Sequence, residues 1–349
     1  MQFQLGQQCD SERGVSGLSP SQTSDVREFG IIKPTSHFVH YAGRVWIGSE
    51  WAPLKAALIQ NNLSQENIKV ACMRGIAQKF GVLEGIQSLY GSGQIEINGA
   101  KGSDQHGKFL DFLGSQGVEL YANLSNGTGS IGNAFTRDKA FVIRDTLYAT
   151  EEGLASTGQG AKALGLAVPL VDPLDELWSG LPNVGRFSPL TEKIEGGDVM
   201  VFDQGNSILV GTNKNTSAEG FHALKRLLSS RGTDVHRIRH TGWHLDTCLA
   251  PLPNGEALYA PRKFPEPIEH SVGRFFKKLE AIDESEASCF LGTNMLWLNP
   301  YQVISTQSVP KTNEVLRKKG YEVHVIDYEE MILKWGSLRC TVCPLIRED

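Results

Sequence analysis

The sequence predicts an α/β protein built from repeated strand–strand–helix–strand units, and two observations support this. Short apolar runs joined by turn residues recur in pairs along the chain, which is typical of β-hairpins. Two of these pairs are followed by a stretch with helical spacing of apolar residues, a glycine that ends it, and a further apolar run. A repeat of this kind indicates that one small unit is used several times.

The clearest unit covers residues 198–238. Its helix is expected to carry Phe221, Leu224, Leu227 and Leu228 on one face and to end before Gly232. The same order of elements returns over residues 294–327. The expected strands are 198–203, 207–211 and 235–238 in the first unit, and 294–298, 302–305 and 323–327 in the second, whose helix runs through Val315 and Leu316.

Weaker copies of the opening hairpin are also visible. One pairs residues 138–143 with 146–149, and another runs from His244 through a turn at Asn254-Gly255 to a strand at 256–259. A fifth copy is predicted more loosely from the segment at Trp46, a strand at 54–59 and a helix around 76 to 89.

Polar or ionisable residues introduce the hairpins. Equivalent strand ends in a closed, repeated architecture converge, so these groups are expected to meet. Such a cluster of carboxylates and a histidine is a candidate for shifted pKa values and for catalysis. The introducing residues are Arg137-Asp138, Glu195-Gly-Gly-Asp198, His244-Leu-Asp246 and Thr293-Asn294.

Composition narrows the class of partner. The chain has 349 residues, 40% hydrophobic and 21% charged, and no apolar run long enough to span a bilayer. A net charge of −5 argues against binding to nucleic acid or to an anionic membrane, because both depend on clustered Lys and Arg. A small-molecule partner fits better.

The first residues differ from the rest. Residues 1–30 are rich in Gln, Ser and Gly and lack the pattern of a secretory signal, so we expect a flexible lead-in followed by a single catalytic domain over 31–349. Six cysteines are too sparse for a disulfide framework in a chain of this length. The expected location is therefore the cytoplasm.

Four motifs, read together and in order, resemble the guanidino-group-modifying (pentein) superfamily. They are Phe135-Thr-Arg-Asp138, Glu195-Gly-Gly-Asp198, His244-Leu-Asp246-Thr247 and Arg339-Cys340-Thr-Val-Cys343-Pro-Leu-Ile-Arg347. The superfamily includes arginine deiminases, dimethylarginine dimethylaminohydrolases and amidinotransferases. The resemblance implies a five-bladed α/β propeller of ββαβ repeats with pseudo-five-fold symmetry, and a role in arginine metabolism.

The resemblance also implies roles for single residues. Cys340 would attack the guanidino carbon as a thiolate and form a covalent amidino-thiol intermediate. His244 would protonate the leaving amine and then activate water, with Glu195 orienting it. Asp138 and Asp246 would grip the guanidinium through paired hydrogen bonds.

Plainer interpretations stand beside these roles. Cys340 would otherwise be an inert buried thiol, or part of a redox pair or zinc site with Cys343, although a zinc site needs two more ligands. Asp198 either binds substrate or holds the Gly-Gly turn. His244 would otherwise be a core histidine, and Glu195 an acid beside a turn. Arg262 and Arg339 are considered for a substrate carboxylate and are not assigned.

The predicted function is cysteine-dependent hydrolysis of arginine or an arginine derivative. The Cys-x-x-Cys-Pro-Leu-Ile-Arg and Phe-Thr-Arg-Asp motifs resemble the hydrolase branch most. An amidinotransferase, which passes the amidino group to an amine, is the alternative, and a non-catalytic binding protein is a third possibility. No phosphate-binding loop, metal-ligand spacing or nicotinamide motif is present, so no cofactor and no metal are expected. A homo-oligomer is left open.

Overall fold

The computed structural model describes residues 45–60, 63, 65–66, 68–70, 95–123, 134–150, 186–190 and 192–348. The predicted lead-in over 1–30 and the predicted helix around 76 to 89 lie outside these residues. No helix in the described ranges has the length and apolar character needed to cross a membrane.

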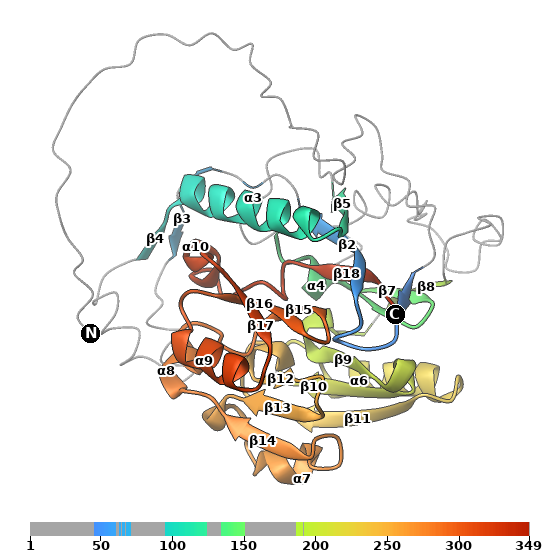
Figure 1. Cartoon of the computed structure of the whole chain (residues 1–349). Coiled ribbons are helices and arrows are strands. Elements are labelled where there is room, and N and C mark those ends of the chain that lie inside the picture. Colours follow the sequence, from blue (N-terminus) through green and yellow to red (C-terminus); the bar gives the residue numbers. More distant parts are fainter. Residues whose placement is uncertain are drawn as a thin grey trace, which may run out of the picture.

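The two clearest predicted units are confirmed. In the first, β9 (Val199–Phe202) pairs antiparallel with β10 (Ser207–Thr212), the chain passes through α6 (Ala218–Ser229), and β11 (Asp234–Arg239) pairs parallel with β10. The second repeats this pattern with β15 (Leu296–Asn299), β16 (Gln302–Thr306), α9 (Pro310–Lys318) and β17 (Glu322–Ile326). Figure 1 colours the first unit yellow-green to yellow and the second orange to red.

The weaker hairpins are confirmed as parts of further three-stranded sheets with the same pairing. One sheet consists of β12 (Leu249–Pro251), β13 (Glu256–Tyr259) and β14 (Lys278–Ala281), with α7 (Ile268–Val272) before its last strand. The other consists of β6 (Ala140–Ile143), β7 (Thr146–Thr150) and β8 (Arg186–Leu190). Sequence reasoning had identified only the opening hairpin of each.

The predicted fifth copy needs correction. The strand that precedes β2 (Leu54–Gln60) in the sheet is β18 (Cys343–Arg347), from the other end of the chain, while β1 (Trp46–Ile47) lies parallel to β18. The unit continues through α3 (Gly99–Ser115) to β5 (Glu119–Asn123), which pairs parallel with β2. Figure 1 shows α3 above this sheet, with β2 and β18 side by side. Both ends of the described chain therefore close one unit.

The remaining elements are short. A two-stranded pair forms from β3 (Ile68–Val70) and β4 (Ile95–Ile97), and small helices connect the sheets. These are α4 (Thr136–Lys139), α8 (Glu284–Cys289) and α10 (Glu329–Ile332), with 3-10 turns η3 (Gly196–Asp198), η4 (Asp203–Gly205), η5 (Leu245–Thr247) and η6 (Pro261–Lys263).

Apolar packing joins the units to one another. Three residues of the predicted face of α6, Phe221, Leu224 and Leu228, are buried in one cluster with residues of β6, β9, β10 and β18, and Leu227 is partly buried against it. Burial of this face removes apolar surface from water and holds the helix against its sheet. The mixed α/β class is thus confirmed among the described residues, whereas a closed ring with pseudo-five-fold symmetry stays a prediction.

Candidate active site

Five of the six predicted site residues lie at the starts of first strands, as the repeat predicts. Asp138 belongs to α4 just before β6. Glu195 precedes η3, which contains Asp198 and leads to β9, and His244 precedes η5, which contains Asp246 and leads to β12. Cys340, the sixth, lies in the loop between α10 and β18. A backbone hydrogen bond from the Arg137 amide to the Cys340 carbonyl, 3.0 Å long, ties this loop to α4.

His244 is fully buried between two carboxylates. Its Nε2 bonds closely to Glu195 Oε2, and its Nδ1 lies 3.3 Å from Asp138 Oδ1. Burial works against the charged imidazole, but Asp138, a hydrogen bond with Cys340, and Glu195 outweigh it, so the pKa of His244 lies well above its ordinary value. The imidazole is therefore protonated at neutral pH and can act as an acid.

The two glycines of the Glu-Gly-Gly-Asp motif permit this packing. A Cβ on Gly197 would lie 2.7 Å from Cγ of His244 and 3.0 Å from Oδ1 of Asp138. A Cβ on Gly196 would lie 2.2 Å from the carbonyl oxygen of Arg137. Only a residue without a side chain lets η3 approach the histidine and α4 so closely.

Cys340 is buried beside a carboxylate and an amide. Its Sγ lies 3.8 Å from Asp246 Oδ2 and accepts a hydrogen bond of 3.1 Å from Asn294 Nδ2. Burial, followed by the charge of Asp246, raises the pKa of the Cys340 thiol to about 12, and hydrogen bonding to His244 opposes this only in part. Without a ligand, the sulfur is held as a thiol.

The pKa of the Asp138 carboxyl is also shifted. Burial raises the pKa of its carboxyl to about 7, with further contributions from Asp246 and Glu195, while the charge of His244 opposes them. Its Oδ1 accepts no hydrogen bond among the described residues. Asp246 Oδ1 likewise accepts no hydrogen bond there, and both oxygens are buried, while Asp138 Oδ1 keeps its 3.3 Å ion-pair contact with His244 Nδ1.

Asp246 shares its second oxygen with an arginine. Arg339 Nη1 donates to Asp246 Oδ2 over 2.7 Å, while its Nη2 donates to Glu50 Oε2 over 3.0 Å. Arg339 is therefore a buried ion-pair partner and is not placed to meet a substrate carboxylate. Arg262 belongs to η6 and is exposed.

Asp198 is saturated by protein donors. Its Oδ1 accepts from the Leu245 amide (2.7 Å) and lies 2.9 Å from His240 Nε2, and its Oδ2 accepts from Thr216 Oγ1 (2.6 Å). Although burial opposes charge on His240, Cys248 and Asp198 raise the pKa of this imidazole to about 10. These side-chain bonds go to residues around His244 and not to the Gly-Gly turn named in the second alternative, so the geometry indicates a structural role for Asp198 beside the histidine.

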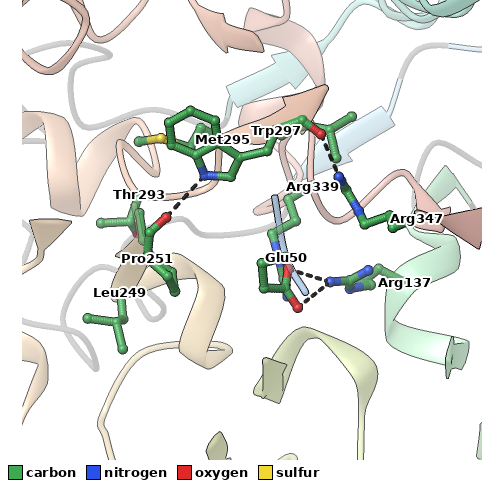
Figure 2. A pocket seen from close by; sticks show the side chains of 11 residues that line it. Glu50, Arg137, Leu249, Pro251, Thr293, Met295, Trp297, Arg339 and Arg347 are labelled. Atoms are coloured by element: carbon green, nitrogen blue, oxygen red, sulfur yellow. Dashed lines mark hydrogen bonds and ion pairs between the residues drawn. The ribbon is translucent and has the colours of Figure 1, made fainter. Parts of the chain in front are cut away.

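A buried charge network lies beneath the site. Glu50 accepts from Arg137 Nη2 and Arg339 Nη2, each over 3.0 Å, and from the amide of Val201 over 3.1 Å. It lines a narrow cavity of about 10 Å³ with Arg137, Arg339 and Arg347, room for roughly one water molecule. Figure 2 shows the Glu50 carboxylate pointing at Arg137, while Arg347 turns to the carbonyl of Trp297.

Three side chains of the site carry atoms that could act as ligands of a metal ion. One ligand atom each from Asp138, Glu195 and His244 lie within 4.8 Å of one another. The close bond between His244 Nε2 and Glu195 already uses two of these groups. The arrangement equally suits an acid–base pair with a cation-binding carboxylate.

The sequence assigned no role to two residues that the structure places here, although it expected Asn294 to lie near the cluster. Asn294 contacts the Cys340 sulfur, and its position before the first strand of a unit, like that of Asp138 or His244, was the available signal. Glu50 has no comparable local signal, because its partners Arg137 and Arg339 are distant in sequence.

Comparisons with known proteins agree with this architecture. The family model for arginine deiminase matches residues 278–347, the segment from β14 to β18 that includes Cys340. SxtG, an amidinotransferase from Microseira wollei in a saxitoxin biosynthetic pathway, has a TM-score of 0.62 over 87% of this chain and 98% of its own, at 16% identity. The family model and these solved structures support the resemblance to the guanidino-group-modifying (pentein) superfamily.

Two further proteins are also similar to this chain. A dimethylarginine dimethylaminohydrolase from Pseudomonas aeruginosa in complex with citrulline has a TM-score of 0.59 over 83% of this chain and 99% of its own, at 18% identity. The uncharacterized protein YkgA of Bacillus subtilis is 26% identical over 247 residues, 71% of this chain and 81% of that protein. At these identities the solved structures establish the pentein fold, and the chemistry rests on the side chains.

Proposed function

We propose that this pentein catalyses cysteine-dependent hydrolysis of a guanidino compound, such as arginine or an arginine derivative. One observation carries the proposal: Oδ1 of Asp138 and Oδ1 of Asp246 are buried and accept no hydrogen bond among the described residues, and both carboxylates act on the charge of Cys340. Asp138 Oδ1 lies 3.3 Å from His244 Nδ1 as an ion pair, and a carboxylate oxygen has a further lone pair for another donor. Buried acceptors are normally satisfied, so two unsatisfied ones at one site indicate a ligand that donates hydrogen bonds. A planar guanidinium offers such donors in a fixed fork.

The ion pair between Arg339 and Asp246 determines how the ligand would bind. Arg339 occupies Oδ2 of Asp246, so the guanidinium would take the remaining Oδ1 and, from the other side, Oδ1 of Asp138. The Arg339 pair fixes the rotamer of Asp246 and leaves one oxygen for the ligand. The position of the guanidino carbon near the sulfur would follow from these fixed oxygens.

Substrate would activate its own nucleophile. The charge of Asp246, and more weakly that of Asp138, helps to keep Cys340 protonated in the free protein. A bound cation neutralises both carboxylates and favours the thiolate. The proton released by the thiol goes to solvent, because His244 already carries a proton and keeps it for the departing nitrogen.

Atoms and protons balance in both steps. The thiolate forms a bond to the guanidino carbon, the bond from that carbon to the departing nitrogen breaks, and His244 gives that nitrogen a proton. The neutral imidazole then takes one proton from water, which attacks the same carbon. The carbon–sulfur bond breaks to restore the thiolate, and the second proton of that water passes to the departed nitrogen or to solvent, which leaves the ureido group. The products are a ureido compound and an amine or ammonium.

The proposed hydrolase is a single domain with a small-molecule substrate. Residues 31–349 act as one catalytic unit, a closed five-bladed propeller of ββαβ repeats, in the cytoplasm, with a small-molecule guanidino substrate and without a cofactor. Glu195 orients His244, and Asp198 holds the turns that carry the histidine. Transfer of the amidino group to an amine uses the same first step, so water and amine are compared directly in the test.

The test incubates the purified protein with arginine, methylated arginines and agmatine, each with and without glycine. Citrulline, ammonia, released amine and new guanidino products are measured. Hydrolysis predicts ureido product with or without glycine, and loss of turnover in Cys340→Ser by a factor of about 10³ or more. Mass spectrometry of the trapped intermediate should locate the adduct on Cys340.

Cys343→Ser is the matched control. Cys343 is equally buried, but its sulfur contacts only the carbonyl of Pro344 among the hydrogen bonds of the described residues. This variant should keep its turnover. Turnover undiminished in Cys340→Ser would overturn the mechanism, and a product in which glycine has gained the amidino group would assign the transferase instead.

A further inference from the structure

Asn294 lies next to Cys340 and contacts its loop in three ways. Its Nδ2 donates to Cys340 Sγ over 3.1 Å, and its Oδ1 accepts from the backbone amides of Arg339 (3.1 Å) and Cys340 (3.3 Å). The side chain is buried, with only 2% of the residue exposed. All of these bonds go to the nucleophile and to the residue before it.

The sulfur has few partners that favour its ionised form. Asp246 and Asp138 both oppose the thiolate, and Asp246 Oδ2 is only 3.8 Å from Sγ. A hydrogen bond donated to the sulfur stabilises its negative charge. Besides His244, the Asn294 amide is the donor that the described residues offer to this sulfur.

We propose that Asn294 is a positioning residue for Cys340, whose side-chain amide stabilises the thiolate while its oxygen fixes the loop that presents the sulfur. Its importance for catalysis rests on the proposed function. Ionisation of the thiol itself can be measured without any substrate, so the two proposals fail separately.

Asn313 shows what an ordinary structural asparagine looks like in the same unit. It is equally buried, and its Nδ2 donates to the backbone carbonyl of Thr306 over 2.9 Å. It has no hydrogen bond to the nucleophile loop among the described residues. Asn313→Ala is therefore a matched control for the loss of a buried amide.

The experiment follows alkylation of Cys340 by iodoacetamide as a function of pH in the full chain. The variants are Asn294→Ala and Asn294→Asp, with Asn313→Ala as control and Cys340→Ser to subtract the other thiols. Circular dichroism checks that each variant is folded. Asn294→Asp keeps an oxygen for the two backbone amides, and so provides a second test if the alanine variant does not fold.

Loss of the Asn294 amide donor should raise the pH at which the rate of Cys340 alkylation is half-maximal. At any pH below this midpoint, the fraction of Cys340 present as thiolate should fall about tenfold or more in Asn294→Ala. The fall should be larger in Asn294→Asp, because the new carboxylate repels the thiolate. Asn313→Ala should titrate like wild type. Folded Asn294 variants whose thiol titrates like wild type would overturn the inference. A shifted titration in a protein that turns over no guanidino compound would uphold this inference while the proposed function fails.

Discussion

Glu50 and Arg339 form a buried ion pair directly behind the nucleophile. Oε2 of Glu50 lies 3.0 Å from Nη2 and 3.2 Å from Nε of Arg339, the residue that precedes Cys340. The same carboxylate accepts from Arg137, which precedes Asp138. One buried acid thus sets the backbone positions of two proposed site residues that come from opposite parts of the chain.

The ion pairs also explain the charge state of Glu50. Burial favours the neutral acid, but Arg339, Arg137 and Arg347 outweigh it and lower the pKa of Glu50 to about 2. Three guanidinium groups depend on this carboxylate, and burial lowers even the pKa of Arg347 to about 9. Arg339 has a second counter-charge in Asp246, but Arg137 and Arg339 both hydrogen-bond to Glu50, so the network is sensitive to loss of this acid.

Glu50→Gln should destabilise the fold strongly. The substitution keeps the shape of the side chain but leaves buried guanidinium groups without a counter-charge, which costs about 3–5 kcal/mol when one partner of a buried ion pair is removed. Urea unfolding followed by circular dichroism measures the change. Asp104→Asn is the control, because Asp104 forms an exposed pair with Lys108 and should shift stability by about 1 kcal/mol or less. Equal effects of the two substitutions would contradict this role of Glu50.

Acid should weaken the fold through the same group. The pKa of Glu50 is lower in the folded state than in the unfolded chain, so its stabilisation is complete above about pH 4.5 and is lost as pH falls toward 2. The loss is on the order of 3 kcal/mol for a shift of this size. Urea unfolding at several pH values between 2 and 6 measures it, and Glu50→Gln should flatten the slope. An unchanged slope in the variant would assign the acid sensitivity to other carboxylates.

The repeat and the ordered motifs were enough to predict the units and the candidate residues. The hairpins at residues 198–211 and 294–305 have strong apolar runs and turn residues, so local patterns specify them. The fifth unit could not be found in this way, because β18 and β2 pair across the two ends of the chain. No local pattern records which distant strand will complete a sheet.

The same limit applies to the site. Cys340, His244 and Asp138 stand in recognisable motifs, and the structure brings them together. Asn294 was noticed as the start of a strand, but its bond to the sulfur depends on how two loops meet. Glu50 gives no signal, since an isolated acid in a loop is usually a solvated charge.

The dependence of activity on pH should reflect the ionisation of the Asp138 carboxyl. Because burial raises the pKa of this carboxyl to about 7, part of the free enzyme near neutral pH lacks the charge that binds the guanidinium. We expect kcat/KM to fall about tenfold per pH unit below about pH 7, since this ratio reports groups of the free enzyme. Steady-state rates with the best guanidino substrate between pH 5 and 9 test this. A flat profile across this range would show that Asp138 is ionised throughout.

The same shift predicts that Asp138 weakens the fold. Its pKa is higher in the folded state than the ordinary value of 3.8, so the destabilisation grows as pH rises from 3.8 to about 7 and is complete above it. Asp138→Asn should therefore raise the free energy of unfolding at pH 8 by about 1–3 kcal/mol while turnover is lost. The gain should disappear near pH 3. Urea unfolding at both values checks this, and a loss of stability at pH 8 would contradict the prediction.

Gly197→Ala should disable the site while leaving the fold intact. The new Cβ would lie 2.7 Å from Cγ of His244 and 3.0 Å from Oδ1 of Asp138, so the imidazole and the carboxylate must move apart. Displacing a proton-transfer group by a fraction of an ångström to one ångström lowers kcat/KM by about 10²-fold. Steady-state kinetics and thermal unfolding of the same preparation measure both effects.

Gly107→Ala is the matched control for that substitution. Gly107 lies within α3, and a Cβ there would meet nothing within 4 Å, so the change adds the same methyl group without a collision. Since alanine is the better helix former, this variant should be more stable by roughly 0.5–1 kcal/mol and fully active. If Gly197→Ala kept its activity as well, the close approach of η3 to His244 would not be required for turnover, and the second glycine of the Glu-Gly-Gly-Asp motif would have no catalytic purpose.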